Sequence, residues 1–293
     1  MRFVTMILPL LLSGVMAADT KPEVRELVRK SLAGINKEDK RMDEYGFVRR
    51  WRRTEFNSDG SVRTKQEGAW RRVLQDGVWV GLTFERNGKP LTAEETAKQE
   101  EAARKYIAER KAMGEAEWKR RQAANRKKGS SDEDEWLQEF PEALDYQVLG
   151  EELIDGRAAV ILQAEPRAGY SPKNMRAKVF EKMRGKLWID KAEGELVRGD
   201  AETFDTVNIG FGILGKIEKG THFHIERRKV GGSFWTQTEQ SMKFDARVML
   251  VKTFKQEIWS ARSEFRHKSE LLAVAGAGGG HAAQAGREAR QAQ

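Results

Sequence analysis

The segment GKLWIDKAEGELVRGDAETF, from Gly185 to Phe204, predicts a β-hairpin. Its strand-forming residues stand on either side of a charged reversal that contains Gly194, and glycine accepts the positive φ of a tight turn. Alternation along the first strand places Leu187 and Ile189 on one face and Trp188 on the other. Because apolar side chains point both ways, we expect the sheet to be covered on both faces at this hairpin.

Three strands joined by two tight turns are predicted upstream, over residues 45–85. The turns are centred on Asp59-Gly60 and Asp76-Gly77, which are favoured dipeptides for two-residue type I′ turns. The resulting register sets Arg52 opposite Glu67 as a cross-strand ion pair. Both faces of this sheet again carry apolar residues, and one of them collects Phe47, Trp51, Trp70, Leu74 and Trp79.

Further strands are expected on both sides of the central hairpin. A turn at Asp155-Gly156 joins a strand at Tyr146–Glu152 to one at Ala158–Pro166. After a glycine-rich crossing, three long strands are expected at 221–230, 233–244 and 246–259. Short reversals between successive strands favour an antiparallel sheet.

Two helices are predicted to accompany this sheet. Residues 19–44 hold an amphipathic helix, because apolar residues recur there at helical spacing. A capping box, Thr92 with Glu95, begins a second helix that is expected to run to about Lys128, over 92–128, with a bend at Gly114. This second helix is highly charged and has a thin apolar stripe. It is therefore either a projecting arm or a lid over an open surface.

The two ends of the chain differ in composition from its middle. A basic start, an apolar run and small residues before Ala17 predict a signal peptide over residues 1–17 and hence a periplasmic protein. A single domain is expected over residues 18–268. Residues 269–293 are rich in Ala, Gly and Gln, and we expect them to be disordered. The chain has no Cys, which excludes disulfides, thiol catalysis and thiolate metal sites.

Two motifs could carry chemistry, and neither predicts a catalytic site. Gly210, Gly212 and Gly215 match the dinucleotide fingerprint but lack the helix that should follow it. His222-x-His224-x-Glu226 places three possible metal ligands on one face of a strand, although such neighbours lie about 7 Å apart. The pattern favours a polar outward face. We therefore predict no catalytic residue, no metal and no cofactor, and a protein that is not an enzyme.

One part of the chain resembles a known family. Ala158–Pro166, the run Arg184-Gly185-Lys186-Leu187-Trp188-Ile189-Asp190 and the returning Leu196-Val197-Arg198 resemble the LolA/LolB-like periplasmic lipoprotein-carrier superfamily, which includes outer-membrane lipoprotein-sorting proteins. The resemblance implies an α+β fold in which a curved antiparallel sheet forms a half-open β-barrel with helices over its concave side. It also implies that acyl chains or a partner peptide bind in the groove.

The sequence leaves two main functions open. The first is a non-enzymatic periplasmic carrier or sensor that binds lipid or lipidated protein through acyl chains. Its groove would be lined by some of Trp51, Trp70, Trp79, Trp188 and Phe211. The second is an envelope interaction protein whose charged helix and basic strands bind another protein, an anionic polymer or an anionic membrane surface; the net charge of +8 permits this. Export argues against nucleic acid, and a metal enzyme would rest only on His222 and His224.

Overall fold

The computed structural model describes residues 20–35, 41–130, 136–209, 215–232, 234–248 and 252–273. The predicted signal peptide, Phe211 and most of the glycine motif at 210–215 lie outside these ranges, as does most of the predicted tail. Residues 268–273, at the end of the described part, are helical. Among the described residues, no helix is long and apolar enough to cross a membrane.

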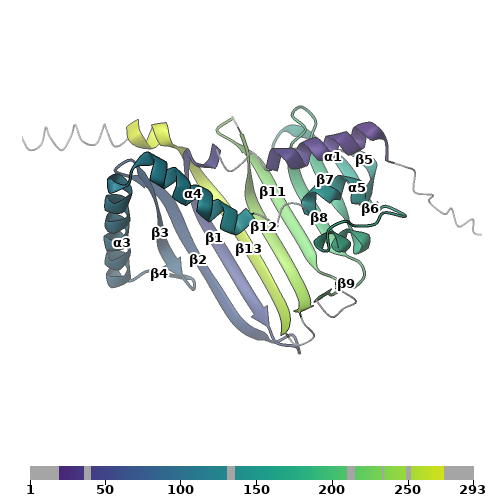
Figure 1. Cartoon of the computed structure of the whole chain (residues 1–293), viewed down its shortest axis with the longest axis horizontal. Coiled ribbons are helices and arrows are strands. Elements are labelled where there is room, and N and C mark those ends of the chain that lie inside the picture. The colour runs from purple at the N-terminus through teal and green to yellow at the C-terminus, as the bar shows by residue number, and fades with distance from the viewer. Residues whose placement is uncertain are drawn as a thin grey trace, which may run out of the picture.

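Within the described ranges, thirteen strands form one antiparallel sheet that does not close (Figure 1). Its order is β4-β3-β2-β1-β13-β12-β11-β8-β7-β6-β5, and β10 attaches β9 to β12. The predicted α+β class with a half-open antiparallel barrel and accompanying helices is confirmed. The strands are β1 (Tyr45–Phe56), β2 (Val62–Gln75), β3 (Val78–Arg86), β4 (Lys89–Pro90), β5 (Leu144–Ile154), β6 (Arg157–Pro166), β7 (Met183–Asp190), β8 (Leu196–Thr203), β9 (Val207–Ile209), β10 (Gly215–Ile217), β11 (His222–Val230), β12 (Phe234–Val248) and β13 (Lys252–His267).

The predicted register of the first three strands is confirmed. Arg52 lies opposite Glu67 with 3.5 Å between their charged atoms. Asp76 and Gly77 both have positive φ, of 50° and 77°, as a type I′ turn requires. The first turn is longer than predicted, because Asn57 N–H donates to the carbonyl of Ser61 and a bulge follows Glu55.

The cross-strand pairs show which side chains share a face of the sheet. Trp51 lies opposite Ser260, and the series continues through Gln240, Ile225 and Gly199 to Leu187. We call the face that carries Trp51 and Leu187 the inner face, and the opposite one the outer face. As predicted, Leu187 and Ile189 share the inner face and Trp188 lies on the outer one.

The main hydrophobic core lies on the inner face of β5–β8. There α1 (Pro22–Ile35) buries Val28 in one cluster with Leu162, Leu187 and Ile189. The short helices η1 (Trp136–Glu139), α5 (Phe140–Ala143) and η2 (Arg176–Lys182) complete this cover. In Figure 1, α1 and α5 accordingly lie over this end of the sheet.

The single helix predicted over 92–128 is instead two helices, α3 (Ala93–Ala112) and α4 (Glu115–Ser130). Met113 is extended between them, with φ −82° and ψ 130°, so the chain turns sharply at Met113-Gly114. The capping box at Thr92 and Glu95 is present as predicted. The polar composition of residues 92–128 predicts helix throughout. It contains no apolar periodicity that would show that the two halves pack in different directions.

The two helices wrap around β3, which borders the sheet wherever the two-residue β4 does not pair with it. The Gln99 side chain accepts from Thr83 N–H at 2.7 Å and donates to the Thr83 carbonyl at 3.1 Å, so it takes the place of a neighbouring strand. Ala103 and Ile107 pack against Val80, whose side chain is on the outer face. Figure 1 shows α4 crossing the sheet on the same side as α1.

The last two strands are longer than predicted. The expected break between residues 244 and 246 is wrong, since β12 continues to Val248 and β13 runs from Lys252 to His267. Asp245, which lies at the expected break, pairs with Lys255 across the strands with 3.8 Å between their charged atoms. A single exposed acid is compatible with a strand when a cation lies opposite.

Candidate ligand-binding site

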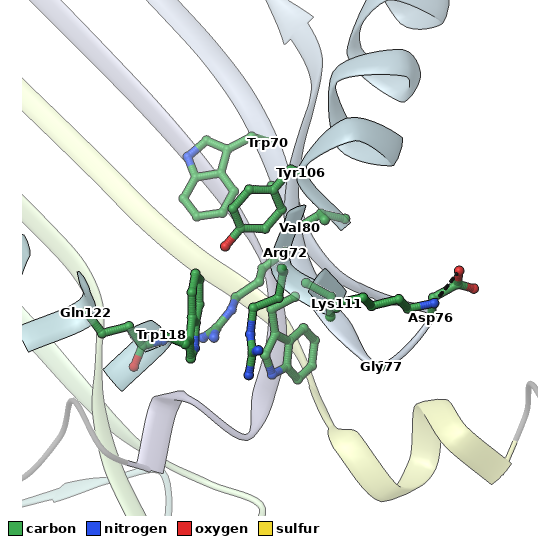
Figure 2. Close-up of a pocket in the computed structure, with 13 residues that line it drawn as sticks. Trp70, Arg72, Asp76, Gly77, Val80, Tyr106, Lys111, Trp118 and Gln122 are labelled. Carbon is green, nitrogen blue, oxygen red and sulfur yellow. Dashed lines mark hydrogen bonds and ion pairs between the residues drawn. The ribbon is translucent and has the colours of Figure 1, made fainter. Parts of the chain in front are cut away.

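A cavity of ≈ 650 Å³ lies between strands β2–β3 and helices α3–α4. Its walls contain four aromatic side chains, and three cationic residues lie among them; Figure 2 shows the labelled members around the cavity. Its volume falls within the range of about 300–1,000 Å³ that is usual for small-molecule pockets. The cavity is lined by Trp70, Arg72, Asp76, Gly77, Val78, Trp79, Val80, Gly81, Tyr106, Arg110, Lys111, Trp118 and Gln122.

The aromatic walls come from both the sheet and the helices. Trp70 and Trp79 belong to β2 and β3, and alternation along these strands places both on the inner face. Tyr106 belongs to α3, and Trp118 belongs to α4, with 6.3 Å between their ring centroids in an edge-on arrangement. The cavity therefore forms only when α3 and α4, which we call the helical arm, fold back over the edge of the sheet.

The cations are held close to these rings. The Arg72 guanidinium lies 4.8 Å from the centroid of Trp79, and that of Arg110 lies 4.6 Å from Trp118. Arg72 also donates to the carbonyl of Met42 at 2.7 Å, and burial lowers the pKa of its guanidinium. Lys111 pairs with Asp76 at 3.0 Å, as the dashed line in Figure 2 marks. The cavity thus combines apolar walls with positive charge.

Apolar side chains continue from the cavity across the inner face. Trp51 on β1 is diagonal to Trp70 on β2, and on the other side it is diagonal to Ile258 on β13. Met242 lies opposite both Ile258 and Phe223. We call the following set, all of whose members are half-buried, the apolar track: Trp51, Phe223, Ile225, Met242, Phe244, Phe254 and Ile258.

The helices leave part of this track uncovered. In Figure 1, the lower parts of β1, β13 and β12 carry no helix in front of them within the described chain. Phe223 and Ile225 pack against the main core at one end of the track. The track therefore runs from the core under α1 to the cavity under α4.

The structure separates the five residues predicted to line a groove. Trp70 and Trp79 line the cavity, and Trp51 lies in the track. Trp188 is on the outer face, where its Nε1–H donates to Glu152 at 2.7 Å and the Arg198 guanidinium lies 5.1 Å from its ring. Phe211 lies outside the described residues.

Sequence reasoning missed Tyr106 and Trp118 as cavity residues. They stand on opposite sides of the break at Met113-Gly114, so no single helical periodicity relates them to the sheet. The available signal was the presence of two large aromatic residues in a segment that is otherwise polar.

The two strand histidines both contact one acid on the outer face. His222 Nε2 and His224 Nδ1 each lie 3.1 Å from an oxygen of Asp200. Burial raises the pKa of the Asp200 carboxyl, but contacts with His224 and His222 outweigh it, and the net shift is downward. Glu226 pairs with Arg198 and Arg228. Among the residues described, no group of three possible ligands is arranged to hold a metal ion.

No protein-family model matches the sequence, and a search of curated proteins finds no match. Among solved structures, the chain is similar to a LolA superfamily protein from Nitrosomonas europaea, with 9% identity, a TM-score of 0.28, and coverage of 83% of this chain and 92% of that one. It is similar to a structure described as an outer membrane lipoprotein-sorting protein domain from Vibrio parahaemolyticus, with 11% identity, a TM-score of 0.28 and the same coverage. It is also similar to the MucA/MucB complex of Pseudomonas aeruginosa, with 10% identity, a TM-score of 0.21, and coverage of 84% and 99%.

The fold and the cavity together define a protein with an open antiparallel sheet and a cavity lined by aromatic and cationic side chains.

Proposed function

We propose that this protein is a non-enzymatic periplasmic carrier or sensor that binds the acyl chains of a lipid or lipidated protein. The observation that carries the proposal is the continuity of the apolar track with the aromatic cavity on one face of an open sheet. The half-buried apolar side chains of the track, outside its end in the main core, would be shielded from water by an acyl chain. The periplasmic location rests on the predicted signal peptide.

In this proposal, the chain of the ligand lies along the track and its end enters the cavity. Trp70 and Trp79 form the floor, while Tyr106 and Trp118 close it from the arm. Arg72 and Lys111 add positive charge among the lining residues, which favours ligands with an anionic group.

Helix α4 acts as a lid in this proposal. None of its side chains at residues 115–124 is buried, and only Trp118 and Gln122 are half-buried. Little apolar area therefore holds α4 in place, and the extended residue Met113 beside Gly114 provides a hinge. Opening at this hinge would uncover the cavity without disturbing α3, which Gln99 fixes to the edge strand.

Fluorescence quenching by a phospholipid with brominated acyl chains tests the proposal. Bromine quenches only nearby indoles, so lipid bound on the inner face should quench Trp51, Trp70, Trp79 and Trp118. The variant with Trp70→Phe and Trp79→Phe should lose a large share of this quenching, whereas the outer-face control Trp188→Phe should keep it. Equal quenching in the two variants, or no quenching of the wild-type chain, would contradict binding on the inner face.

A second candidate is an interaction protein that uses the helical arm, because α4 exposes most of its described charged side chains. Such a protein would capture a partner through Arg120 and Arg121 and would carry no lipid. Charge reversal at these two positions should then abolish partner capture while leaving the quenching unchanged.

A further inference from the structure

The outer face holds a second cavity, of ≈ 360 Å³, whose lining shares only Arg72 with that of the proposed lipid site. Strands β1, β2, β3 and β13 form it together with the helical residues 268–273. Val48 lies opposite Arg71, Arg50 follows two residues after Val48, and Arg266 lies opposite Gly46. The register therefore brings three guanidinium-bearing residues from three strands to one place.

An apolar ring, Phe84, lies beside two of these cations. The Arg71 guanidinium is 4.7 Å from the centroid of Phe84, and that of Arg50 is 5.6 Å from it. Val48 is buried and Val73 is half-buried, and both line the same cavity. The cavity thus has an apolar floor with arginines around it.

Arg71 and Arg266 differ from the other outer-face arginines in their partners. Arg52 pairs with Glu67, and Arg63 pairs with Glu55. For Arg71 and Arg266, no carboxylate lies within ion-pair distance in the described part of the chain. Arg50 has Glu85 at 3.2 Å, and Glu264 is the one carboxylate among the lining residues.

Like charges that converge without matching acids repel one another, and an anion placed between them relieves this repulsion. A guanidinium donates two parallel hydrogen bonds to a phosphate, which gives both strength and orientation. The apolar floor would accept the glycerol and first methylene groups attached to such a phosphate. The combination therefore fits an amphiphilic phosphate better than a free inorganic ion.

We infer that this outer cavity binds the phosphate headgroup of an anionic phospholipid and docks the protein on a membrane surface. The inference concerns the outer face and stands independently of acyl-chain binding on the inner face.

Co-sedimentation with vesicles tests this inference. The full chain should bind vesicles in which about a third of the phosphatidylcholine is replaced by phosphatidylglycerol, and should not bind pure phosphatidylcholine vesicles. Each basic side chain near such a surface contributes about 1 kcal/mol, so the variant with Arg71→Gln and Arg266→Gln should lose about 30-fold in affinity. The matched control, Arg52→Gln with Arg63→Gln, removes the same charge from paired arginines and should lose less than about threefold.

Two further experiments distinguish a lipid phosphate from a free phosphate and binding on the outer face from binding on the inner face. Short-chain phosphatidylglycerol should protect Arg71 from a guanidinium-modifying reagent, and inorganic phosphate at the same concentration should not. The inner-face variant Trp70→Phe with Trp79→Phe should keep vesicle binding. Three outcomes would each overturn the inference: equal losses of affinity in the two arginine pairs, loss of vesicle binding in the tryptophan variant, or no vesicle binding by the wild-type chain. Capture of an acidic protein would not rescue it.

Discussion

Replacing Asp190 with alanine is expected to lower the free energy of unfolding by about 3 kcal/mol, because it breaks a buried charge pair. Asp190 ends β7 in the central hairpin, and its side chain is 1% exposed. It accepts from Arg157 Nε at 2.7 Å and Nη2 at 2.9 Å, and from the backbone N–H of Glu193 at 2.8 Å. The carboxylate thus joins strand β6 to the turn that follows β7.

The size of this loss in the free energy of unfolding follows from how deeply each of the two charged side chains is buried. Removing one partner of a buried pair costs about 3–5 kcal/mol, because the other charge is left without compensation. The Arg157 side chain is 34% exposed and has Glu193 as a second partner at 2.8 Å, so the lower end of that range applies. Asp190→Asn should cost less than Asp190→Ala, because an amide oxygen can still accept from the Glu193 N–H.

The pH dependence of this effect has a definite sign. Burial raises the pKa of Asp190, but hydrogen bonds from Arg157 and from the Glu193 backbone outweigh it, so the net shift is downward. A carboxyl with a lowered folded pKa stabilises the fold fully above its unfolded pKa, about 4, and this contribution is lost as pH falls through the folded value. The difference in stability between wild type and Asp190→Asn should therefore shrink below about pH 4.

Urea denaturation of the wild type, both Asp190 variants and a matched control measures these values. The control is Asp205→Asn, since Asp205 is 58% exposed and pairs with Lys182 at 3.1 Å; it should change stability by less than about 0.5 kcal/mol. If Asp190→Ala costs no more than the control, or if its cost does not fall in acid, the proposed role of this pair is wrong.

Three further predictions concern the sheet and the arm. Gly185→Ala should destabilise the protein by about 1–3 kcal/mol in urea denaturation, because the new Cβ would lie 2.8 Å from that of Ala201; an unchanged midpoint would refute this close approach. Gln99→Ala removes both hydrogen bonds to Thr83 and should cost about 1 kcal/mol while exposing the edge of β3, so light scattering should show association that Glu100→Ala does not cause. Thr92→Ala should cost about 1 kcal/mol of thermal stability, and a variant as stable as wild type would show that the capping box does not hold α3 in place.

The sequence predicted the features that depend on residues close together in the chain, namely the tight turns and the alternation along strands. Asp76-Gly77 and Asp155-Gly156 fix their hairpins locally, and the register of β2 and β3 follows from the first of these and the alternation of the strands. The register of β1 and β2 was predicted from the Asp59-Gly60 turn, and it holds as far as the bulge after Glu55. The faces of Leu187 and Trp188 were likewise predictable from alternation.

What the sequence did not predict depends on contacts between distant segments. The cavity requires Trp118 of α4 to meet strands β2 and β3, and this position follows from the turn at Met113-Gly114. Alternation along a strand also does not show which face of the sheet carries the cavity. It therefore could not predict that Trp188 lies on the opposite face from Trp70 and Trp79. The extra length of the first turn comes with a bulge after Glu55 that local composition does not reveal.

Binding on the inner face is tested most directly by native mass spectrometry followed by lipid extraction. The protein is purified for this under mild conditions from the cell envelope of the organism that produces it. The account predicts an added mass on the folded chain that the extract identifies as an acyl-bearing molecule. The variant with Trp70→Phe and Trp79→Phe should carry less of it than Trp188→Phe. A wild-type chain that is free of added mass and gives no acyl chains on extraction would contradict the account.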